Sequence, residues 1–179
     1  MNDGLIPNRY AKALYKLSQE RGDTALIYKE MKQLEAAYSV EAGLKKAVNN
    51  PFLPVDDKLK LLCAASGAEH DGTSAKFMGL VIKNNRIDFM RAIALAFMKQ
   101  YRELNGIARV EIVTATQLGD DEINGIIGVV KAQLGDKTIE LSKRVNPDLI
   151  GGFTVDVDSR VLDASVKNQL EKLRLKLLS

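Results

Sequence analysis

The chain has 179 residues, of which 46% are hydrophobic and 27% charged, and its formal net charge is +3 at pH 7. This composition is that of a globular protein with one domain or two small ones, and it excludes a disordered or collagen-like chain. Divided at Asn105, the N-terminal part is mildly basic and the remainder is close to neutral. Neither part has the concentrated positive charge expected of a nucleic-acid-binding protein.

The single cysteine excludes an internal disulfide and fits a reducing compartment. Cys63 lies in the run Leu61-Leu62-Cys63-Ala64-Ala65, which predicts a buried hydrophobic position and not a reactive thiol. The N-terminus lacks the basic and apolar regions of a signal peptide, and no window approaches the roughly 18 apolar residues of a membrane span. The sequence therefore predicts a cytosolic protein with no direct membrane insertion.

Residues 6–104 have the apolar spacing of helices throughout. Six helices joined by short connections predict a compact six-helix bundle over residues 1–105. The third helix is the segment 41–48. The apolar positions of the other five are, for the first helix, Tyr10, Leu14 and Leu17; for the second, Ile27, Met31, Leu34 and Tyr38; for the fourth, Val55, Leu59 and Leu62; for the fifth, Phe77, Met78, Val81 and Ile82; and for the sixth, Met90, Ile93, Phe97, Tyr101 and Leu104.

Turn and capping residues predict where these helices begin and end. Asn49-Asn50-Pro51 closes the third helix, and Ser74 is placed to cap the fifth. Asn84-Asn85 breaks the fifth helix, and Asn105-Gly106 is a typical C-terminal stop for the sixth.

After Gly106 the pattern changes to alternating, β-branched segments. Strands are predicted over 107–116, 138–145, 153–157 and 161–162, with a helix over 120–134 and another from Val166 to the C-terminus. Asp158-Ser159 is suited to a hairpin turn between the last two strands. Residues 106–179 are thus predicted to form a small α+β domain, and the whole chain belongs to the α+β class with mainly α structure.

The sequence lacks the common signatures of catalysis. It contains no phosphate-binding loop, no dinucleotide fingerprint and no nucleophile elbow. Its only histidine, His70, has no second histidine with which to bind a metal, and the only cysteine, Cys63, is predicted to be a buried hydrophobic position. We therefore predict a protein that is not an enzyme, with no catalytic residues, no metal site and no cofactor.

Gly151-Gly152 is the nearest feature to a glycine-rich loop. Its position between two strands predicts a structural role, either a positive φ or a close approach of two backbone segments.

The C-terminal helix has an apolar stripe formed by Val166, Leu170, Leu173 and Leu177, at spacings of four, three and four. Two interpretations remain open: the stripe covers one face of the small sheet, or its end binds a partner helix. The first helix is a second candidate surface. Its small residues Ala11 and Ala13 allow another helix to approach closely, and a groove between it and the fifth helix would suit an amphipathic helix.

Several motifs resemble those of the delta subunit of F-type ATP synthase, called the oligomycin-sensitivity-conferring protein in mitochondria, and the likeness runs essentially end to end. Three residues depart from the usual family pattern: Asn146, Asp158 and Ala164. The motifs that carry the resemblance are Arg9-Tyr10-Ala11-Lys12-Ala13-Leu14; Asn49-Asn50-Pro51-Phe52; Lys58-Leu59-Lys60-Leu61-Leu62; Asn84-Asn85-Arg86-Ile87; Val145-x-Pro147-x-Leu149-Ile150-Gly151-Gly152; Val161-Leu162-Asp163-x-Ser165-Val166; and Leu170-x-x-Leu173.

The resemblance implies a stator role at the cytoplasmic face of the bacterial plasma membrane, without catalysis. The helical domain would hold the N-terminal helix of an alpha subunit of the catalytic head, and the C-terminal domain would bind the b subunits of the peripheral stalk. The protein would thereby resist rotor torque during ATP synthesis coupled to ion transport. The implied head contacts are Tyr10, Ala13, Leu14, Phe77 and Val81, and the implied stalk contacts are Val166, Leu170, Leu173 and Leu177. The alternative is a helical nucleic-acid-binding or regulatory adaptor, which the mild positive charge alone suggests.

Overall fold

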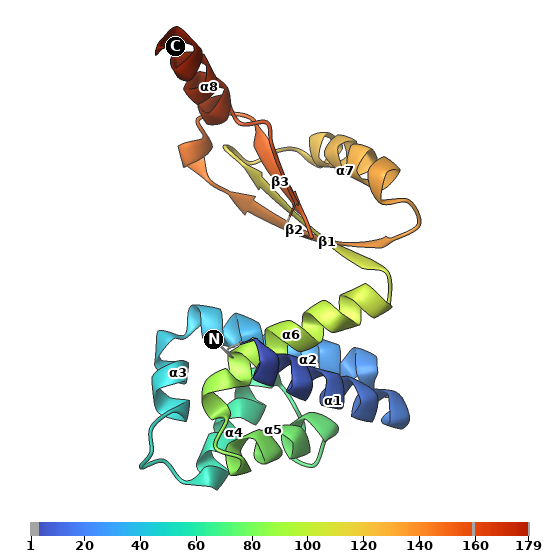
Figure 1. Ribbon diagram of the computed structural model, residues 1–179, viewed down its shortest axis with the longest axis vertical. Helices are drawn as coiled ribbons and strands as arrows, with labels where there is room; N and C mark the ends of the chain where they lie inside the picture. Colours follow the sequence, from blue (N-terminus) through green and yellow to red (C-terminus); the bar gives the residue numbers. More distant parts are fainter. Residues whose placement is uncertain (1–3, 159, 179) are drawn as a thin grey trace. The chain divides into compact units, whose positions relative to one another are not determined.

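The computed structural model describes residues 4–158 and 160–178, which form two compact units that divide between Tyr101 and Arg102 (Figure 1). The fold is α+β and mostly helical, with a small mixed sheet in the second unit. In chain order the elements are α1 (Leu5–Arg21), α2 (Thr24–Val40), α3 (Ala42–Val48), α4 (Val55–Ser66), α5 (Thr73–Lys83), the 3-10 turn η1 (Ile87–Phe89), α6 (Met90–Leu104), β1 (Ile107–Thr114), α7 (Asp120–Leu134), β2 (Thr138–Val145), the 3-10 turn η2 (Pro147–Leu149), β3 (Phe153–Val157), β4 (Arg160–Asp163) and α8 (Val166–Leu178).

The helices of the first unit share one core. Each of α1 to α6 contributes at least one buried apolar side chain to it, as the predicted helical periodicity requires. Leu14, Met31 and Phe97 are among the side chains with no exposed surface. Acidic Asp56 and Asp57 occupy the first turn of α4, where the helix dipole favours negative charge.

The predicted cap of α5 is wrong. Gly72 occupies the N-cap position, and Ser74 lies within the first turn of the helix. The Ser74 hydroxyl is buried and donates a hydrogen bond to the carboxylate of Glu30 on α2. Because a buried carboxylate needs a donor, this tertiary bond uses the hydroxyl that local capping would otherwise have used.

The sheet of the second unit has the strand order β2-β1-β3-β4. Strands β1 and β2 are parallel, with Val110 opposite Leu141, while β1–β3 and β3–β4 are antiparallel. Parallel neighbours require a crossover connection, and α7 provides it between β1 and β2. The antiparallel β3–β4 pair agrees with the predicted hairpin, although Ser159 of its turn lies outside the described residues.

One face of this sheet packs against α7 (Figure 1). Val110, Ile112 and Val155 from the strands meet Ile123 and Val130 from the helix, as the alternation of the sequence predicts. Among the described residues, none from α8 belongs to this core. The interpretation in which α8 covers the sheet is therefore not supported, and its start packs against η2 instead.

The glycine pair allows the start of α8 to pack closely against the loop before β3. Gly152 has a φ of +73°, and a Cβ there would overlap the carbonyl oxygen of Ala164. A Cβ on Gly151 would lie 2.9 Å from Cγ2 of Val166, whose N–H donates to the Gly151 carbonyl over 3.0 Å. The predicted structural role of the pair is confirmed in both of its forms, positive φ and close backbone approach.

We expect Gly152→Ala to lower the free energy of unfolding by about 2–4 kcal/mol, because the new methyl group meets backbone in a conformation that alanine disfavours. Gly128→Ala is the matched control, since a Cβ on this residue of α7 has no neighbour within 4 Å. The control should raise stability by about 0.5–1 kcal/mol through better helix propensity. Urea unfolding followed by far-ultraviolet circular dichroism measures both, and equal stability of the two variants would contradict the seating of α8 on the glycines.

Candidate protein-binding sites

The surface between α1 and α5 is built on an aromatic contact. The rings of Tyr10 and Phe77 meet edge to face, with centroids 6.2 Å apart, and the side-chain amide of Asn84 donates to the Tyr10 hydroxyl over 3.0 Å. Edge-to-face rings attract through their quadrupoles, so this contact fixes the two helices side by side at this point.

Helix α1 has two apolar stripes on adjacent faces. The inward stripe includes Ala11, Leu14 and Tyr15, which are buried. The second stripe, at spacings of four, three and four, is only partly covered within the described chain; we call it the outer stripe, and it consists of Ile6, Tyr10, Ala13 and Leu17. On α5, Leu80 is 50% exposed and lies one turn after Phe77, the residue that contacts Tyr10.

The five predicted head contacts thus occupy different depths. Tyr10 is half-buried and Ala13 is exposed, so both reach the surface. Leu14, Phe77 and Val81 are buried in the core of the first unit. In the predicted stripe of Tyr10, Leu14 and Leu17, only Leu14 is fully buried; the exposed Leu80 was not among the predicted contacts. Its exposure could not be read from the sequence, because its spacing in α5 fits either face of the helix.

The C-terminal surface is the apolar stripe of α8. Val166 is half-buried against Gly151, whereas Leu170, Leu173 and Leu177 are 51%, 56% and 86% exposed. Leu175, on the opposite side of the helix, is also exposed. The side chain of Leu178 is outside what the structure describes.

The first turn of α8 is fixed by a network of polar contacts. The Ser165 hydroxyl accepts from the backbone N–H of Asn168 over 3.2 Å, which makes Ser165 the N-cap. The Asp163 carboxylate accepts from the backbone N–H of Ser165 over 2.9 Å. Hydrogen bonds from Ser165, first through its side chain and then through its backbone, lower the pKa of Asp163. The helix therefore starts at a defined position, although the leucines along its described length are more than half exposed.

The three departures from the family pattern fit this geometry. Asn146 still caps η2, because its side-chain oxygen accepts from the N–H of Asp148. Asp158 has a φ of +47°, which aspartate tolerates better than most residues, and its carboxylate accepts from the N–H of Arg109. Ala164 donates its N–H to the Phe153 carbonyl.

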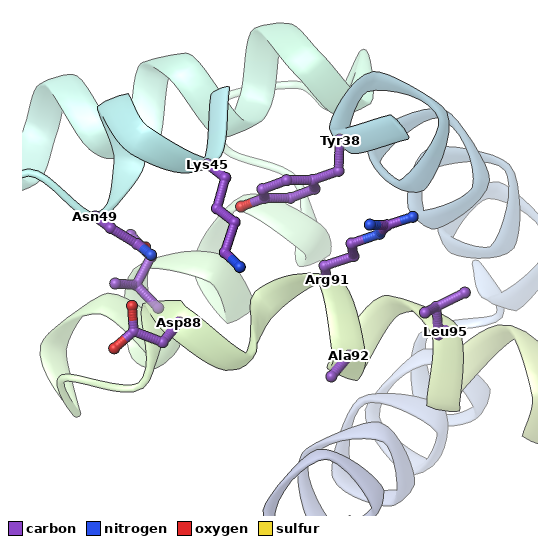
Figure 2. Close-up of a pocket in the computed structure, with 8 residues that line it drawn as sticks. Tyr38, Lys45, Asn49, Asp88, Arg91, Ala92 and Leu95 are labelled. Atoms are coloured by element: carbon purple, nitrogen blue, oxygen red, sulfur yellow. The ribbon is translucent and has the colours of Figure 1, made fainter. Parts of the chain in front are cut away.

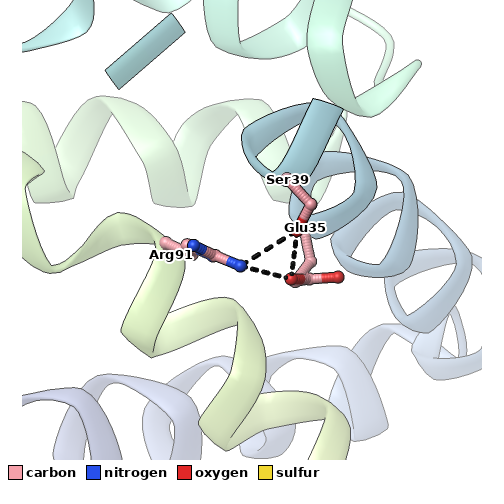
Figure 3. Close-up of polar contacts among 3 residues, drawn as sticks. All are labelled: Glu35, Ser39 and Arg91. Carbon is pink, nitrogen blue, oxygen red and sulfur yellow. Dashed lines mark hydrogen bonds and ion pairs between the residues drawn. The ribbon is translucent and has the colours of Figure 1, made fainter. Parts of the chain in front are cut away.

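A pocket of about 260 Å³ opens on the first unit between α2, α3 and the start of α6 (Figure 2). Its wall carries charges of both signs, Lys45 and Asp88 among them. The Arg91 guanidinium is turned toward α2, where it donates to Glu35 over 3.0 Å and to the Ser39 hydroxyl over 2.9 Å (Figure 3). These contacts occupy the Arg91 guanidinium and tie α6 to α2 at the edge of the pocket.

The remaining candidates for chemistry have ordinary surroundings. Cys63 is buried as predicted, and burial together with the charge of Glu30 raises the pKa of its thiol, which disfavours the reactive thiolate. His70 is exposed in a turn, and no group of metal-ligating side chains occurs in the described parts of the chain. Within those same parts, none of the helices is both long and apolar enough to cross a bilayer.

The fold presents partly exposed apolar faces on two helices, α1 and α8, and such faces are typical of proteins that bind other proteins. Comparison with known families makes this specific: residues 6–177 match the family model of the ATP synthase delta (OSCP) subunit. The chain belongs to this family. Its members are structural, non-catalytic components of the peripheral stalk of F-type ATP synthase, and the chain is a stator subunit of this kind.

Similar proteins cover almost the whole chain. The ATP synthase subunit delta of Parabacteroides distasonis is 36% identical, over 99% of this chain and 98% of its own length. That of Bacteroides thetaiotaomicron is 33% identical, over 97% and 94%. A chain in the cryo-EM structure of the Toxoplasma gondii mitochondrial ATP synthase hexamer has the same fold, with a TM-score of 0.72 at 20% identity over 97% of both chains.

Burial raises the pKa of Tyr38, which lines the pocket, to about 12. The unfolded chain ionises this phenol near its usual pKa of 10.0, whereas the folded chain holds the proton up to about pH 12. The contribution to stability is therefore complete below pH 10 and is lost as the pH rises toward 12. We expect Tyr38→Phe to lose less stability than the unmodified protein across this range in urea unfolding.

Absorbance at 295 nm gives an independent measurement. The difference between the titrations of the unmodified protein and Tyr38→Phe, recorded directly after a pH jump, should have its midpoint near pH 12. A midpoint near 10 would mean that the phenol is not shielded from water.

Proposed function

We propose that the chain links the catalytic head of the ATP synthase to its peripheral stalk through two separate attachments. In this proposal the helical domain, residues 1–105, is a six-helix bundle that binds the N-terminal helix of an alpha subunit. The small domain, residues 106–179, binds the b subunits. The chain would lie at the cytoplasmic face of the bacterial plasma membrane, attached through its partners.

The observation that carries the proposal is the exposure of the α8 stripe. Three leucines on one face of a helix, each more than half exposed, are costly in water unless a partner covers them. The stripe has the four-three-four spacing of a helix that packs along another helix. An exposed apolar face with this spacing supports a helical partner.

The outer stripe of α1 supports the second attachment. Ala13 provides a small, exposed position at which a partner helix can approach closely, and Tyr10 and Leu80 offer apolar surface on either side. Leu14, Phe77 and Val81 would contribute indirectly, because they are buried in the core and fix the positions of α1 and α5.

Energetics favours two attachments over one. Burying an apolar side chain yields roughly 1.5–3 kcal/mol, so the four residues of the α8 stripe give at most about 6–12 kcal/mol, which is no more than comparable to the estimated cost of association, about 4–15 kcal/mol. Once one surface is bound within an assembly, the other binds at a high effective concentration. Two modest contacts can therefore hold against torque where one would dissociate.

We expect Ala13→Asp to weaken binding of an alpha-subunit N-terminal peptide by about 10- to 100-fold, because it buries a charge in an apolar contact. Ala36→Asp is the matched control, since it makes the same change at an exposed position of α2. Fluorescence anisotropy with a labelled peptide measures both affinities. Full affinity of Ala13→Asp would place the head contact elsewhere on the first unit.

At the other end, Leu173→Ser should reduce binding to the cytoplasmic part of the b subunits by about tenfold or more. Leu175→Ser removes a leucine of similar exposure from the opposite face and should leave binding unchanged. Both variants should keep the unfolding free energy within about 0.5 kcal/mol, because the side chains are exposed. Biolayer interferometry gives the affinities, and equal losses in the two variants would contradict a contact confined to the stripe.

A further inference from the structure

The residues beside the α8 stripe are basic or neutral. With Val166 and Leu173 at d and Leu170 and Leu177 at a of a heptad, the flanking e and g positions are Lys167, Arg174, Gln169 and Lys176. Glu171, the one acidic residue of the helix, falls at b, outside the seam. In paired helices the e and g positions decide by their charge which partner is accepted.

The helix dipole does not explain all of the basic residues at the e and g positions, as Lys167 shows. Basic side chains near the C-terminal end of a helix favour the helix dipole, which explains Arg174 and Lys176. Lys167 lies in the first turn, where the dipole disfavours positive charge and where α8 has no acidic residue. Its charge also lowers the pKa of Asp163, but the hydrogen bonds from Ser165 are the larger cause of that shift.

A second copy of this chain is a poor occupant of the stripe. Neither parallel nor antiparallel pairing of two α8 helices brings an acidic e or g residue opposite Lys167 or Arg174, because α8 has none. Like charges at these positions oppose association. A helix with acidic residues at these positions is a better electrostatic match for the stripe than a second α8.

We propose that α8 pairs with an acidic amphipathic helix, whose apolar seam is bordered by Glu or Asp side chains at the positions that face Lys167 and Arg174. This inference deepens the stalk contact proposed above and rests on it for the biological identity of the partner. The leucines supply the affinity of the contact, and the basic borders supply its selectivity and its orientation.

Two designed helical peptides test the inference on the full-length chain. They share one leucine seam and differ only at e and g, which are Glu in one peptide and Lys in the other. We expect the Glu peptide to bind about tenfold tighter or more in fluorescence anisotropy, and the difference to shrink as salt is raised. Leu173→Ser should weaken the binding of both peptides.

The double variant Lys167→Glu/Arg174→Glu should reverse the preference between the peptides. Lys131→Glu/Lys137→Glu is the matched control, because it makes the same change of net charge at exposed positions in the same unit and should keep the original preference. Circular dichroism of each variant verifies that the helix content is unchanged. Equal binding of the two peptides, or a preference that the double variant leaves intact, would overturn the inference.

Binding to the b subunits separates this inference from the proposed function. If the b subunits bind equally well to the unmodified chain and to Lys167→Glu/Arg174→Glu, the stalk contact stands and its acidic character is refuted. If the chain selects the Glu peptide but does not bind the b subunits, the inference stands and the stalk assignment fails.

Discussion

The second unit depends on the close approach of two backbone segments, Gly151-Gly152 and residues 164–166. The Val166 N–H binds the Gly151 carbonyl, and the space beside Gly152 is filled by the carbonyl of Ala164. Only residues without a side chain permit this approach. The contact fixes the first turn of α8, while Leu170, Leu173 and Leu177 farther along the helix are each more than half exposed and remain available for a partner.

In the first unit, one helix both packs on the core and leaves an apolar stripe partly exposed. In α1, residues such as Leu14 bind the helix to the common core, while the outer stripe stays partly exposed. The contact between Tyr10 and Phe77 sets the spacing between α1 and α5, and Asn84 holds the tyrosine ring in place. A binding surface built on such a core is preorganised, so little conformational entropy is lost when a helix docks.

Local sequence signals predicted most of the secondary structure because the periodicity of apolar residues matches the geometry of each element. Helix α7 and strand β2 have the predicted bounds, and the break at Asn84-Asn85 is present. The prediction that Ser74 caps α5 was wrong because the buried carboxylate of Glu30, on α2, binds the same hydroxyl. That competition involves residues 44 positions apart, and local pattern carries no information about it.

The sequence by itself determined the elements, the non-catalytic character and, through its motifs, the family. Only the tertiary structure decided which apolar stripes are buried. Helix α7 and helix α8 both carry such a stripe, yet α7 packs on the sheet whereas the leucines of α8 are exposed. The physical reason is that periodicity shows that a face is apolar, while burial depends on whether another segment of the chain reaches it. The glycine pair seats α8 by its first turn, and beyond that turn its leucines stay open to a partner.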